Sequence, residues 1–366
     1  FFSGVVIPRT YFNSAEMHSV PLKEDVLFVK DLTMSATADY SATAENPLSF
    51  DFYFGPNDYP LLSSLDDKIM RADDEDLDMT RLVPLGWGLF RYINKWIVIP
   101  VFTFLGHYIS NYGIIILLLT IFIKIILFPF TYKSYMSQAK MRLLAPEIKE
   151  INEKYPGQEN AMTRQQKTME LYSRAGANPM AGCLPMLLQM PVLIAMFTFF
   201  PSCIELRGEP FLWVKDLSAP DAIITWSGNI PLVTEYFGNH LSLFCLLMTV
   251  TNIIYTKVTM QNQPSGASMP GMKWMMYLMP LMFLVFFNNY AAGLSYYYFL
   301  SLLITIVQTY VFRHVVNEEK MRAKMQEASK KPRKKSGFMA RLEEAQRQQQ
   351  AMLREQEKRK KGANRR

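Results

Sequence analysis

The chain has 366 residues, of which 50% are hydrophobic and only 19% are charged, and its mean hydropathy is +0.03. This composition argues against a purely soluble enzyme, because soluble domains usually carry about 25% charged residues. The net charge of +7 is unevenly spread: residues 1–85 hold 6 basic and 15 acidic residues, whereas residues 314–366 hold 17 basic and 7 acidic residues. We therefore expect the two ends to lie in different compartments or to face different partners.

The cysteines give no sign of a metal centre. Cys183, Cys203 and Cys245 lie within or beside apolar runs, and the sequence contains no CxxC motif and no Cys/His cluster. We expect neither a metal site nor a cofactor.

The chain starts at Phe1, without a methionine and in what reads as the middle of a domain, so we take it to be a piece of a longer protein.

Residues 1–82 are predicted to be the end of a β domain followed by an acidic linker. Short β-type runs, such as 26–30 (VLFVK) and 48–54 (LSFDFYF), are separated by turns that contain Gly, Pro and Asn. Such a stretch is too short to be a domain by itself, so we expect it to be one edge of a larger β domain. Residues 66–78 are rich in Asp and are expected to form a solvated linker.

Residues 83–106 contain an aromatic, amphipathic stretch at 86–100 (GWGLFRYINKWIVIP) that ends at a proline. Trp and Tyr rings prefer the boundary between headgroups and hydrocarbon, so this segment is predicted to be an interfacial helix on the outer leaflet. The alternative is an aromatic belt at the end of a long first span.

Apolar windows of about 20 residues, the length that crosses a bilayer, predict five transmembrane spans. The spans are 107–132, 181–203, 241–257, 273–289 and 291–313. The last two come from one charge-free window, 274–312, which as a single helix would reach about 58 Å and must therefore fold back. Its polar break lies at 288–293 (NNYAAG), and the fourth span before it is short, so we expect local thinning of the bilayer there.

Charges in the connecting segments predict the orientation. Segments 133–176 and 314–366 hold 8 and 17 Lys and Arg residues, and the short segment 258–272 is flanked by two lysines and contains no acid, so these three are placed in the cytoplasm. Segment 204–240 holds two basic and five acidic residues and is placed outside, together with the acidic N-terminal region.

Residues 133–176 are predicted to be an antiparallel helical hairpin. Apolar residues recur at every third or fourth position, a Pro-Gly pair provides the turn, and a glycine can cap the second helix. The recurring residues are Met136, Ala139, Leu143, Ile148, Ile151, Tyr155, Met162, Met169 and Tyr172. The hairpin is either a rigid spacer or, because nothing else in the chain obviously covers its methionine-containing stripe, a contact surface for an incoming polypeptide or a partner.

The tail, residues 314–366, starts as a helix and continues into Lys/Arg-rich and Gln-rich blocks. Its strongest basic run consists of Lys330, Lys331, Arg333, Lys334 and Lys335. Such a run attracts polyanions, so we expect it to bind ribosomal RNA or anionic lipids; the alternative is a solvated tail that only sets the topology.

Lys124 is the main anomaly within the spans, because a Lys inside a bilayer costs several kcal/mol and no Asp or Glu lies in any predicted span. It either snorkels to the cytoplasmic surface or is kept charged by water. The second alternative predicts a water-filled groove that opens to the cytoplasm. The polar residues that could line it are Thr120, Gln189, Tyr296, Tyr297, Tyr298 and Gln308, although each alone could be a helix-packing hydrogen bond.

The sequence contains no recognisable catalytic motif. The four histidines, at positions 18, 107, 240 and 314, lie outside the predicted spans or at their ends, and neither a Walker motif nor an intramembrane Ser/His or paired-Asp arrangement occurs. We therefore expect no enzymatic activity and no small-molecule substrate. A coupled transporter would normally carry intramembrane carboxylates and inverted repeats, which are not visible here.

Several segments resemble the hallmark sequences of the YidC membrane-protein insertases, a bacterial family with mitochondrial and chloroplast relatives. They are 133–147 (KSYMSQAKMRLLAPE), 178–191 (NPMAGCLPMLLQMP), 204–221 (IELRGEPFLWVKDLSAPD), 277–287 (YLMPLMFLVFF) and 293–308 (GLSYYYFLSLLITIVQ). The resemblance covers about residues 50–315. It implies a polytopic α-helical membrane protein with a five-transmembrane-helix insertase core, a hydrophilic groove, a cytoplasmic helical hairpin and the C-terminal edge of a periplasmic β-sandwich domain.

The resemblance also implies roles for single residues. Lys124 matches the family's groove arginine, Thr120 the groove threonine one turn before it, and Tyr297 and Tyr298 the tyrosine pair of the last span. Lys in place of Arg keeps the positive charge but loses the forked donor of a guanidinium group. The family's apolar substrate slide falls on the second and fourth spans, here Leu184, Met190, Val192, Leu193, Phe197, Phe283 and Phe287.

For function, the resemblance implies a membrane protein insertase and assembly chaperone of the inner membrane, which moves nascent transmembrane segments into lipid without nucleotide hydrolysis. The implied partners are nascent membrane proteins, the ribosome, the Sec translocon and anionic lipids. The alternative is a Sec-associated folding and assembly subunit that has no insertion activity of its own.

Overall fold

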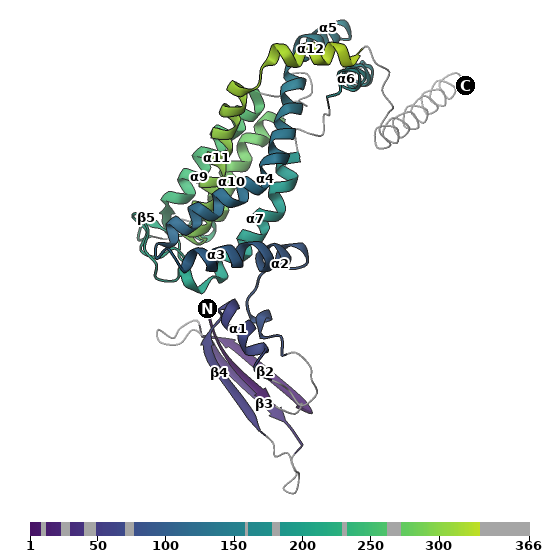
Figure 1. Ribbon diagram of the computed structural model, residues 1–366. Coiled ribbons are helices and arrows are strands. Elements are labelled where there is room, and N and C mark those ends of the chain that lie inside the picture. Colours follow the sequence, from purple (N-terminus) through teal and green to yellow (C-terminus); the bar gives the residue numbers. More distant parts are fainter. Residues whose placement is uncertain are drawn as a thin grey trace, which may run out of the picture. The chain divides into compact units, whose positions relative to one another are not determined.

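The computed structural model describes residues 1–8, 12–22, 30–39, 49–69, 77–157, 160–177, 184–228, 233–261 and 272–329 (Figure 1). The chain divides into two compact units. The larger unit comprises Phe1–Ser134, Cys183–Gln261 and Ser268–Arg313, and the smaller unit comprises Tyr135–Gly182, Asn262–Ala267 and His314–Arg366.

The N-terminal part of the larger unit contains two antiparallel strand pairs. β1 (Phe2–Pro8) pairs with β4 (Phe50–Pro56), and β2 (Ser14–Pro21) pairs with β3 (Lys30–Thr37). Side chains of β4 alternate between exposed and half-buried, as expected when one face of a strand is covered. The strand predicted at 48–54 is confirmed by β4, whereas most of the run predicted at 26–30 lies outside the described residues.

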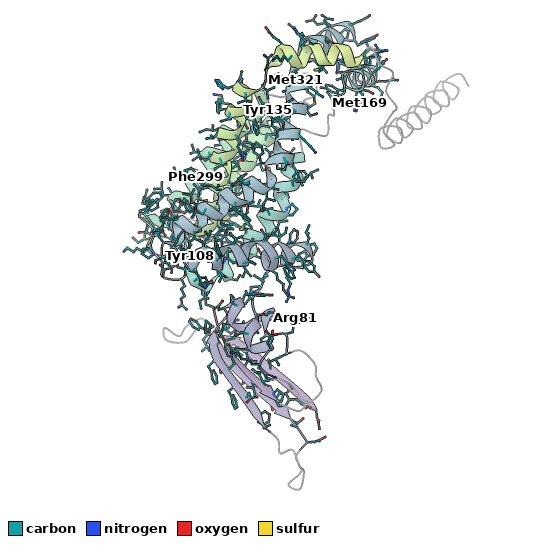
Figure 2. The ribbon with its side chains drawn as sticks, viewed as in Figure 1. Arg81, Tyr108, Tyr135, Met169, Phe299 and Met321 are labelled. Carbon is teal, nitrogen blue, oxygen red and sulfur yellow. The ribbon has the colours of Figure 1, made fainter. Side chains whose placement is uncertain are left out.

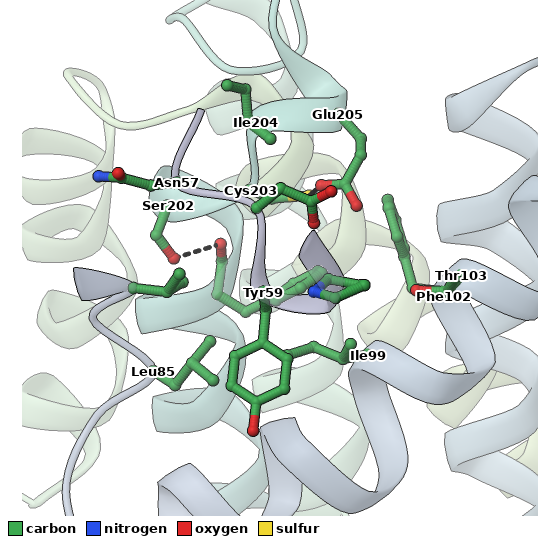
Figure 3. A pocket seen from close by; sticks show the side chains of 14 residues that line it. Asn57, Tyr59, Leu85, Ile99, Phe102, Thr103, Ser202, Cys203, Ile204 and Glu205 are labelled. Atoms are coloured by element: carbon green, nitrogen blue, oxygen red, sulfur yellow. Dashed lines mark hydrogen bonds between the residues drawn. The ribbon is translucent and has the colours of Figure 1, made fainter. Parts of the chain in front are cut away.

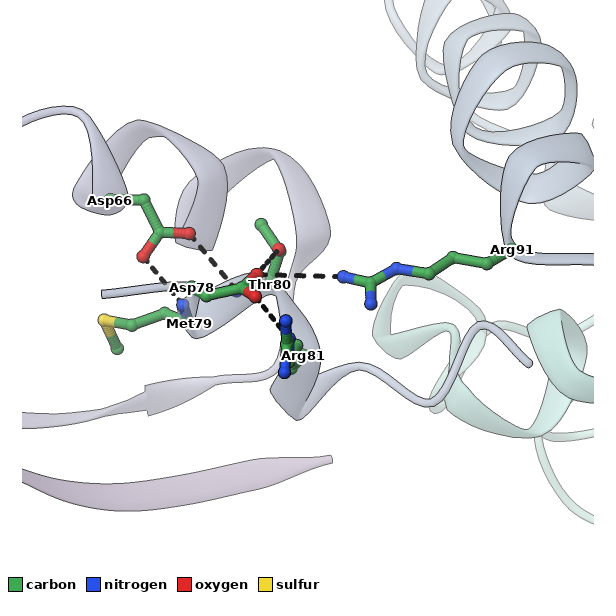
Figure 4. A network of polar contacts seen from close by, with 6 residues as sticks. All are labelled: Asp66, Asp78, Met79, Thr80, Arg81 and Arg91. Carbon is green, nitrogen blue, oxygen red and sulfur yellow. Dashed lines mark hydrogen bonds and ion pairs between the residues drawn. The ribbon is translucent and has the colours of Figure 1, made fainter. Parts of the chain in front are cut away.

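A helix and a 3-10 turn follow the strands. α1 is Tyr59–Asp66 and η1 is Met79–Leu82. The Asp66 carboxylate accepts hydrogen bonds from two backbone N–H groups of η1, at 2.7 and 3.3 Å. Asp78, just before η1, forms ion pairs with Arg81 and Arg91 (Figure 4). These two acids, predicted to belong to a solvated linker, therefore hold the end of that linker in place.

One helical segment precedes the long apolar helices. It consists of α2 (Leu89–Ile93), the π-helical turn η2 (Asn94–Val98) and α3 (Ile99–Gly106). The wide π turn ends just before Pro100, whose ring and missing N–H disturb regular helix geometry. The amide of Asn94 is fully buried and donates hydrogen bonds to the carbonyl oxygens of Leu85 (3.0 Å) and Ala195 (2.9 Å). The helix predicted at 86–100 is thus confirmed, and it extends to Gly106.

The described residues contain five apolar helices at the positions of the five predicted spans. They are α4 (Tyr112–Leu143), α7 (Leu184–Ser202), α9 (Leu243–Gln261), α10 (Met272–Phe287) and α11 (Ala292–Val315). Three of them, α4, α9 and α11, are long and apolar enough to cross a membrane, and α7 and α10 contain shorter apolar stretches. A four-residue turn separates α10 from α11, so the chain folds back where the sequence predicted it.

Buried polar side chains fix the loop between α7 and α9. The loop contains η4 (Ile204–Leu206), β5 (Ala222–Thr225), α8 (Val233–Tyr236) and β6 (His240–Ser242). Buried Asp221 accepts hydrogen bonds from Ser242 Oγ, from Trp213 Nε1 (3.0 Å) and from the backbone N–H of Phe244 at the start of α9 (2.9 Å). Fully buried Asn288, after α10, donates to two loop carbonyls at 2.7 and 2.8 Å. The loop is therefore bonded to the ends of α9 and α10.

The smaller unit is helical. It contains the end of α4 together with α5 (Ala145–Lys154), α6 (Ala161–Ala175) and α12 (Glu318–Ser329). The predicted hairpin is present as α5 and α6, which contact each other. The expectation that nothing else in the chain covers its methionine-containing stripe is wrong in part: α12 packs against α6 with its own Met321 and Met325 buried, and Met169 is half-buried, whereas Met162 stays exposed (Figure 2). Arg142 of α4 also forms an ion pair with Glu318 of α12.

Candidate functional site

Lys124 lies on α4 inside the larger unit. Only 8% of the residue is exposed, so the side chain does not snorkel to a surface of the protein. Its Nζ donates hydrogen bonds to Thr305 Oγ1 at 2.8 Å and to Gln189 Oε1 at 3.3 Å. Because Gln189 belongs to α7 and Thr305 to α11, the ammonium group joins three of the apolar helices.

The hydrogen bonds around Lys124 have a defined direction. Thr305 donates its own hydroxyl proton to the carbonyl oxygen of Ser301 (2.7 Å), which leaves the Thr305 oxygen free to accept from Lys124. The Gln189 amide donates to Ser301 Oγ (3.2 Å) while its oxygen accepts from Lys124. We call Lys124, Gln189, Ser301 and Thr305 the Lys124 cluster. The acceptors in the cluster are all neutral, and the five apolar helices contain no Asp or Glu. The buried ammonium group of Lys124 is therefore stabilised by the dipoles of neutral side chains and not by a carboxylate.

Two other residues predicted to line a groove are not hydrogen-bonded to this cluster. Thr120 is fully buried, and its hydroxyl donates to the carbonyl oxygen of Ile116 in its own helix (2.7 Å). Gln308 is half-buried on α11 and makes no hydrogen bond to the four members of the cluster. Of the predicted polar residues outside the tyrosines, Gln189 is therefore the one that bonds to Lys124.

The three consecutive tyrosines of α11 do not form one wall. Successive residues of a helix point about 100° apart, because one turn takes 3.6 residues. Tyr296 accordingly packs against Phe244, with 4.9 Å between ring centroids, whereas Tyr298 packs against Phe287 at 6.3 Å. Tyr297 between them is fully buried, with its hydroxyl beside the Gln189 side chain of the Lys124 cluster.

Sequence reasoning missed Ser301 and Thr305. The signal that could have found them is their spacing, since four residues place both side chains on one face of α11. Gln308 was predicted instead; it lies three residues after Thr305 and shares this face of the helix, but no hydrogen bond joins it to Lys124. A helical projection of α11 alone would have placed Ser301, Thr305 and Gln308 on one face.

The residues assigned to an apolar slide differ in exposure. Met190 is exposed, Val192, Leu193, Phe197 and Phe283 are half-buried, Phe287 is buried, and the side chain of Leu184 lies outside the described ones. Phe287 therefore belongs to the aromatic core of the larger unit. The exposed apolar surface of α10 includes instead Met275, Leu278, Met282 and Phe286, which recur at every third or fourth position, together with other exposed apolar residues of this helix.

A second group of polar side chains lines a small cavity of about 20 Å³ where α3 and the end of α7 meet the residues after β4 (Figure 3). Burial, together with the neighbouring carboxylate of Glu205, raises the pKa of Asp58 above its usual value. Cys203 donates its thiol proton to Glu205 (3.0 Å). Among the described residues, no three His, Cys, Asp or Glu side chains are placed to hold a metal ion. The basic run 330–335 lies outside the described residues.

Comparison with known proteins identifies relatives of the chain. A family model described as 60Kd inner membrane protein matches residues 104–321. A curated protein of Parabacteroides distasonis, described as membrane protein insertase YidC, is 59% identical over 363 residues, which are 99% of this chain and 57% of the relative. A protein of Porphyromonas gingivalis with the same description is 50% identical over 363 residues, which are 98% of this chain and 58% of the relative. The chain thus spans somewhat more than half the length of these relatives.

A solved structure, described as an active YidC insertase crystal structure with the first transmembrane domain resolved, is 24% identical and covers 78% of this chain and 58% of its own. Its TM-score of 0.45 is too low to support an argument about the fold. The matched range 104–321, in contrast, contains all five apolar helices and the whole Lys124 cluster. The chain therefore belongs to the 60Kd inner membrane protein family, whose curated members found here are YidC insertases, as the resemblance of its motifs predicted.

Proposed function

We propose that this chain is the membrane-embedded part of an insertase that moves nascent transmembrane segments into the inner membrane without nucleotide hydrolysis. The observation that carries the proposal is the Lys124 cluster, which is buried and contains no carboxylate. An apolar residue at position 124 would pack the helices equally well, so packing alone does not explain the lysine. Relatives described as membrane protein insertases support the same activity. An intramembrane cation without an ionic partner is a functional site by default.

The proposed topology has five spans, namely α4, α7, α9, α10 and α11. The acidic N-terminal region and the loop between α7 and α9 lie on the periplasmic side, and the smaller unit with the basic tail lies in the cytoplasm. On this topology the strand pairs belong to the edge of a periplasmic β-sandwich, and the α2–α3 segment lies on the outer leaflet. The charges of these segments support the assignment.

In the proposed mechanism, the Lys124 cluster gives the polar end of a nascent segment a hydrated place inside the membrane. Two of the three N–H donors of Lys124 are used by Gln189 and Thr305, so the third is left for water or for an acidic group of the client. Helix α10, with 16 residues, reaches about 24 Å, which is less than the roughly 30 Å of a hydrocarbon core. A locally thin bilayer shortens the distance over which polar groups of the client are without water.

The hydrophobic part of the client is proposed to move along α7 and α10 into lipid. Met190 and the exposed apolar face of α10 support such a path, because these side chains are not covered by the protein. Burial of about 20 apolar residues in lipid then drives insertion. Neither nucleotide nor cofactor enters this scheme.

The basic tail is proposed to hold the ribosome, with anionic lipids as a second partner. Its run of Lys330, Lys331, Arg333, Lys334 and Lys335 supports a polyanion partner by charge alone. Binding of this kind weakens steeply as salt is added, because it depends on counterion release. Deletion of residues 317–366 should therefore lower ribosome affinity at low salt.

The test uses the full-length protein in liposomes together with a ribosome-bound chain that carries one hydrophobic span and a short acidic N-terminal segment. Protease protection of this segment is expected in liposomes with the protein and absent from empty liposomes. Protection that also required the Sec translocon would contradict autonomous insertion and would favour a Sec-associated assembly subunit.

A further inference from the structure

A groove of about 710 Å³ lies between α1 and the helical segment formed by η2 and α3. One wall presents Tyr59, Ser63 and Asp67, and the other presents Lys95, Ile99, Thr103 and His107. In both rows the residues follow one another at intervals of four, which places each row on one face of its helix. The groove is therefore bounded by two helical faces, and its shape does not depend on the conformation of a single loop.

The two walls carry opposite charges. Lys95 and Asp67 are both exposed, and neither forms an ion pair with another residue of the described ranges. Between them the lining is largely apolar and includes Ile99, Pro100 and Phe104. A fitting ligand has one anionic and one cationic group, attached to an apolar body.

Exposed aromatic side chains indicate the depth at which the groove lies in a bilayer. Trp96, Phe104 and Tyr108 are 68%, 61% and 76% exposed, and Phe104 and Tyr108 also line the groove. The Lys95 ammonium lies 5.8 Å from the centroid of the Trp96 ring. Exposed aromatic rings beside a Lys are typical of the headgroup region. The mouth of the groove then opens among lipid headgroups.

We propose that this groove binds the headgroup of an aminophospholipid of the outer leaflet, such as phosphatidylethanolamine. The phosphate contacts Lys95 and the primary ammonium donates to Asp67. A choline headgroup has no N–H to donate, and a purely anionic headgroup is repelled by Asp67. The proposal rests on the interfacial position of the α2–α3 segment given above. A bound headgroup would bridge α1 to α3 and so hold the region after the strands against the membrane.

The test measures lipid retention by the full-length protein. The protein is purified from nanodiscs of equimolar phosphatidylethanolamine and phosphatidylcholine, and the lipids that remain bound are identified by native mass spectrometry. We expect enrichment of phosphatidylethanolamine, and a loss of about fivefold or more in this preference for Lys95→Gln and for Asp67→Asn, because each removes one charge-assisted contact. Lys68→Gln is the matched control, since Lys68 is an exposed neighbour of Asp67 outside the groove lining and its loss should leave the preference unchanged.

A second mixture, of phosphatidylethanolamine and phosphatidylglycerol, separates recognition of the amine from recognition of phosphate. Equal retention of both lipids, with Asp67→Asn unchanged from the parent, would overturn the proposal, as would absence of any enrichment in the first mixture. Because no client protein is present, this result does not depend on insertion activity. Failure of the insertion assay with retained lipid preference would therefore count against the proposed function alone.

Discussion

Replacing Thr305 with Val removes one of the two side-chain acceptors of the Lys124 ammonium while keeping the shape of the side chain. The lost hydrogen bond is the shorter one, 2.8 Å against 3.3 Å to Gln189. Hydrogen bonds to charged groups contribute about 1.5–3 kcal/mol. We expect Thr305→Val to lower the free energy of unfolding by this amount and to reduce insertion.

Thr309 provides a matched control for this substitution. It lies one turn further along α11, and its hydroxyl donates to the carbonyl oxygen of Thr305 at 2.8 Å, as Thr305 does to Ser301 at 2.7 Å, but it does not bond to Lys124. Thr309→Val therefore reproduces the loss of a hydroxyl without the loss of the acceptor. Thr305→Ser keeps the acceptor and should behave like the parent protein.

The assay is unfolding of the detergent-purified protein followed by tryptophan fluorescence, repeated in a Lys124→Leu background. Without the ammonium group, Thr305→Val should cost no more than Thr309→Val, because the two sites are then equivalent. An equal cost of Thr305→Val in both backgrounds would refute the argument that Thr305 acts through Lys124.

Three further predictions concern contacts outside the Lys124 cluster. Glu318→Arg should break the ion pair with Arg142 and speed amide hydrogen exchange in α12 about two- to fivefold, and adding Arg142→Glu should restore the parent rate; a double variant that exchanges as fast as the single one would contradict the pairing. Because the pKa of Asp58 is raised in the fold, its protonated form is stabilising, and this contribution is lost as the pH rises through the raised pKa. Asp58→Asn should therefore melt above the parent at pH 7, and the difference should shrink in acid; a lower melting temperature at pH 7 would show that the charge is needed. Asp221→Ala leaves three donors unsatisfied and should lower the free energy of unfolding by about 3 kcal/mol or more, measured against Asp216→Ala, which lies in the same loop but is only half-buried.

The positions of the apolar helices could be predicted from the sequence because membrane segments need long charge-free windows. The fold-back between α10 and α11 followed from length alone, since 39 residues exceed one crossing. The contact of α12 with α6 could not be predicted in this way. Met321 and Met325 are spaced four apart, but they lie in a charged tail, and only tertiary packing reveals what they cover.

The candidate site was predictable in part. Lys124 stands out by charge, and Gln189 by being polar within an apolar span. Its other partners depend on how α4, α7 and α11 are rotated against one another, which no single helix sequence specifies. For this reason a short hydroxyl side chain, Thr305, bonds to Lys124 where the tyrosines were predicted, and the successive tyrosine rings point in different directions.

The most direct measurement is the insertion of the single-span nascent chain by liposomes that contain the parent protein, Lys124→Arg or Lys124→Leu. The parent and Lys124→Arg should give the same protease-protected fragment, because both place a cation among the acceptors of the cluster. Lys124→Leu should give little or none, although it folds and binds ribosomes. Full protection by Lys124→Leu would contradict the central claim that a buried cation at this position supports insertion.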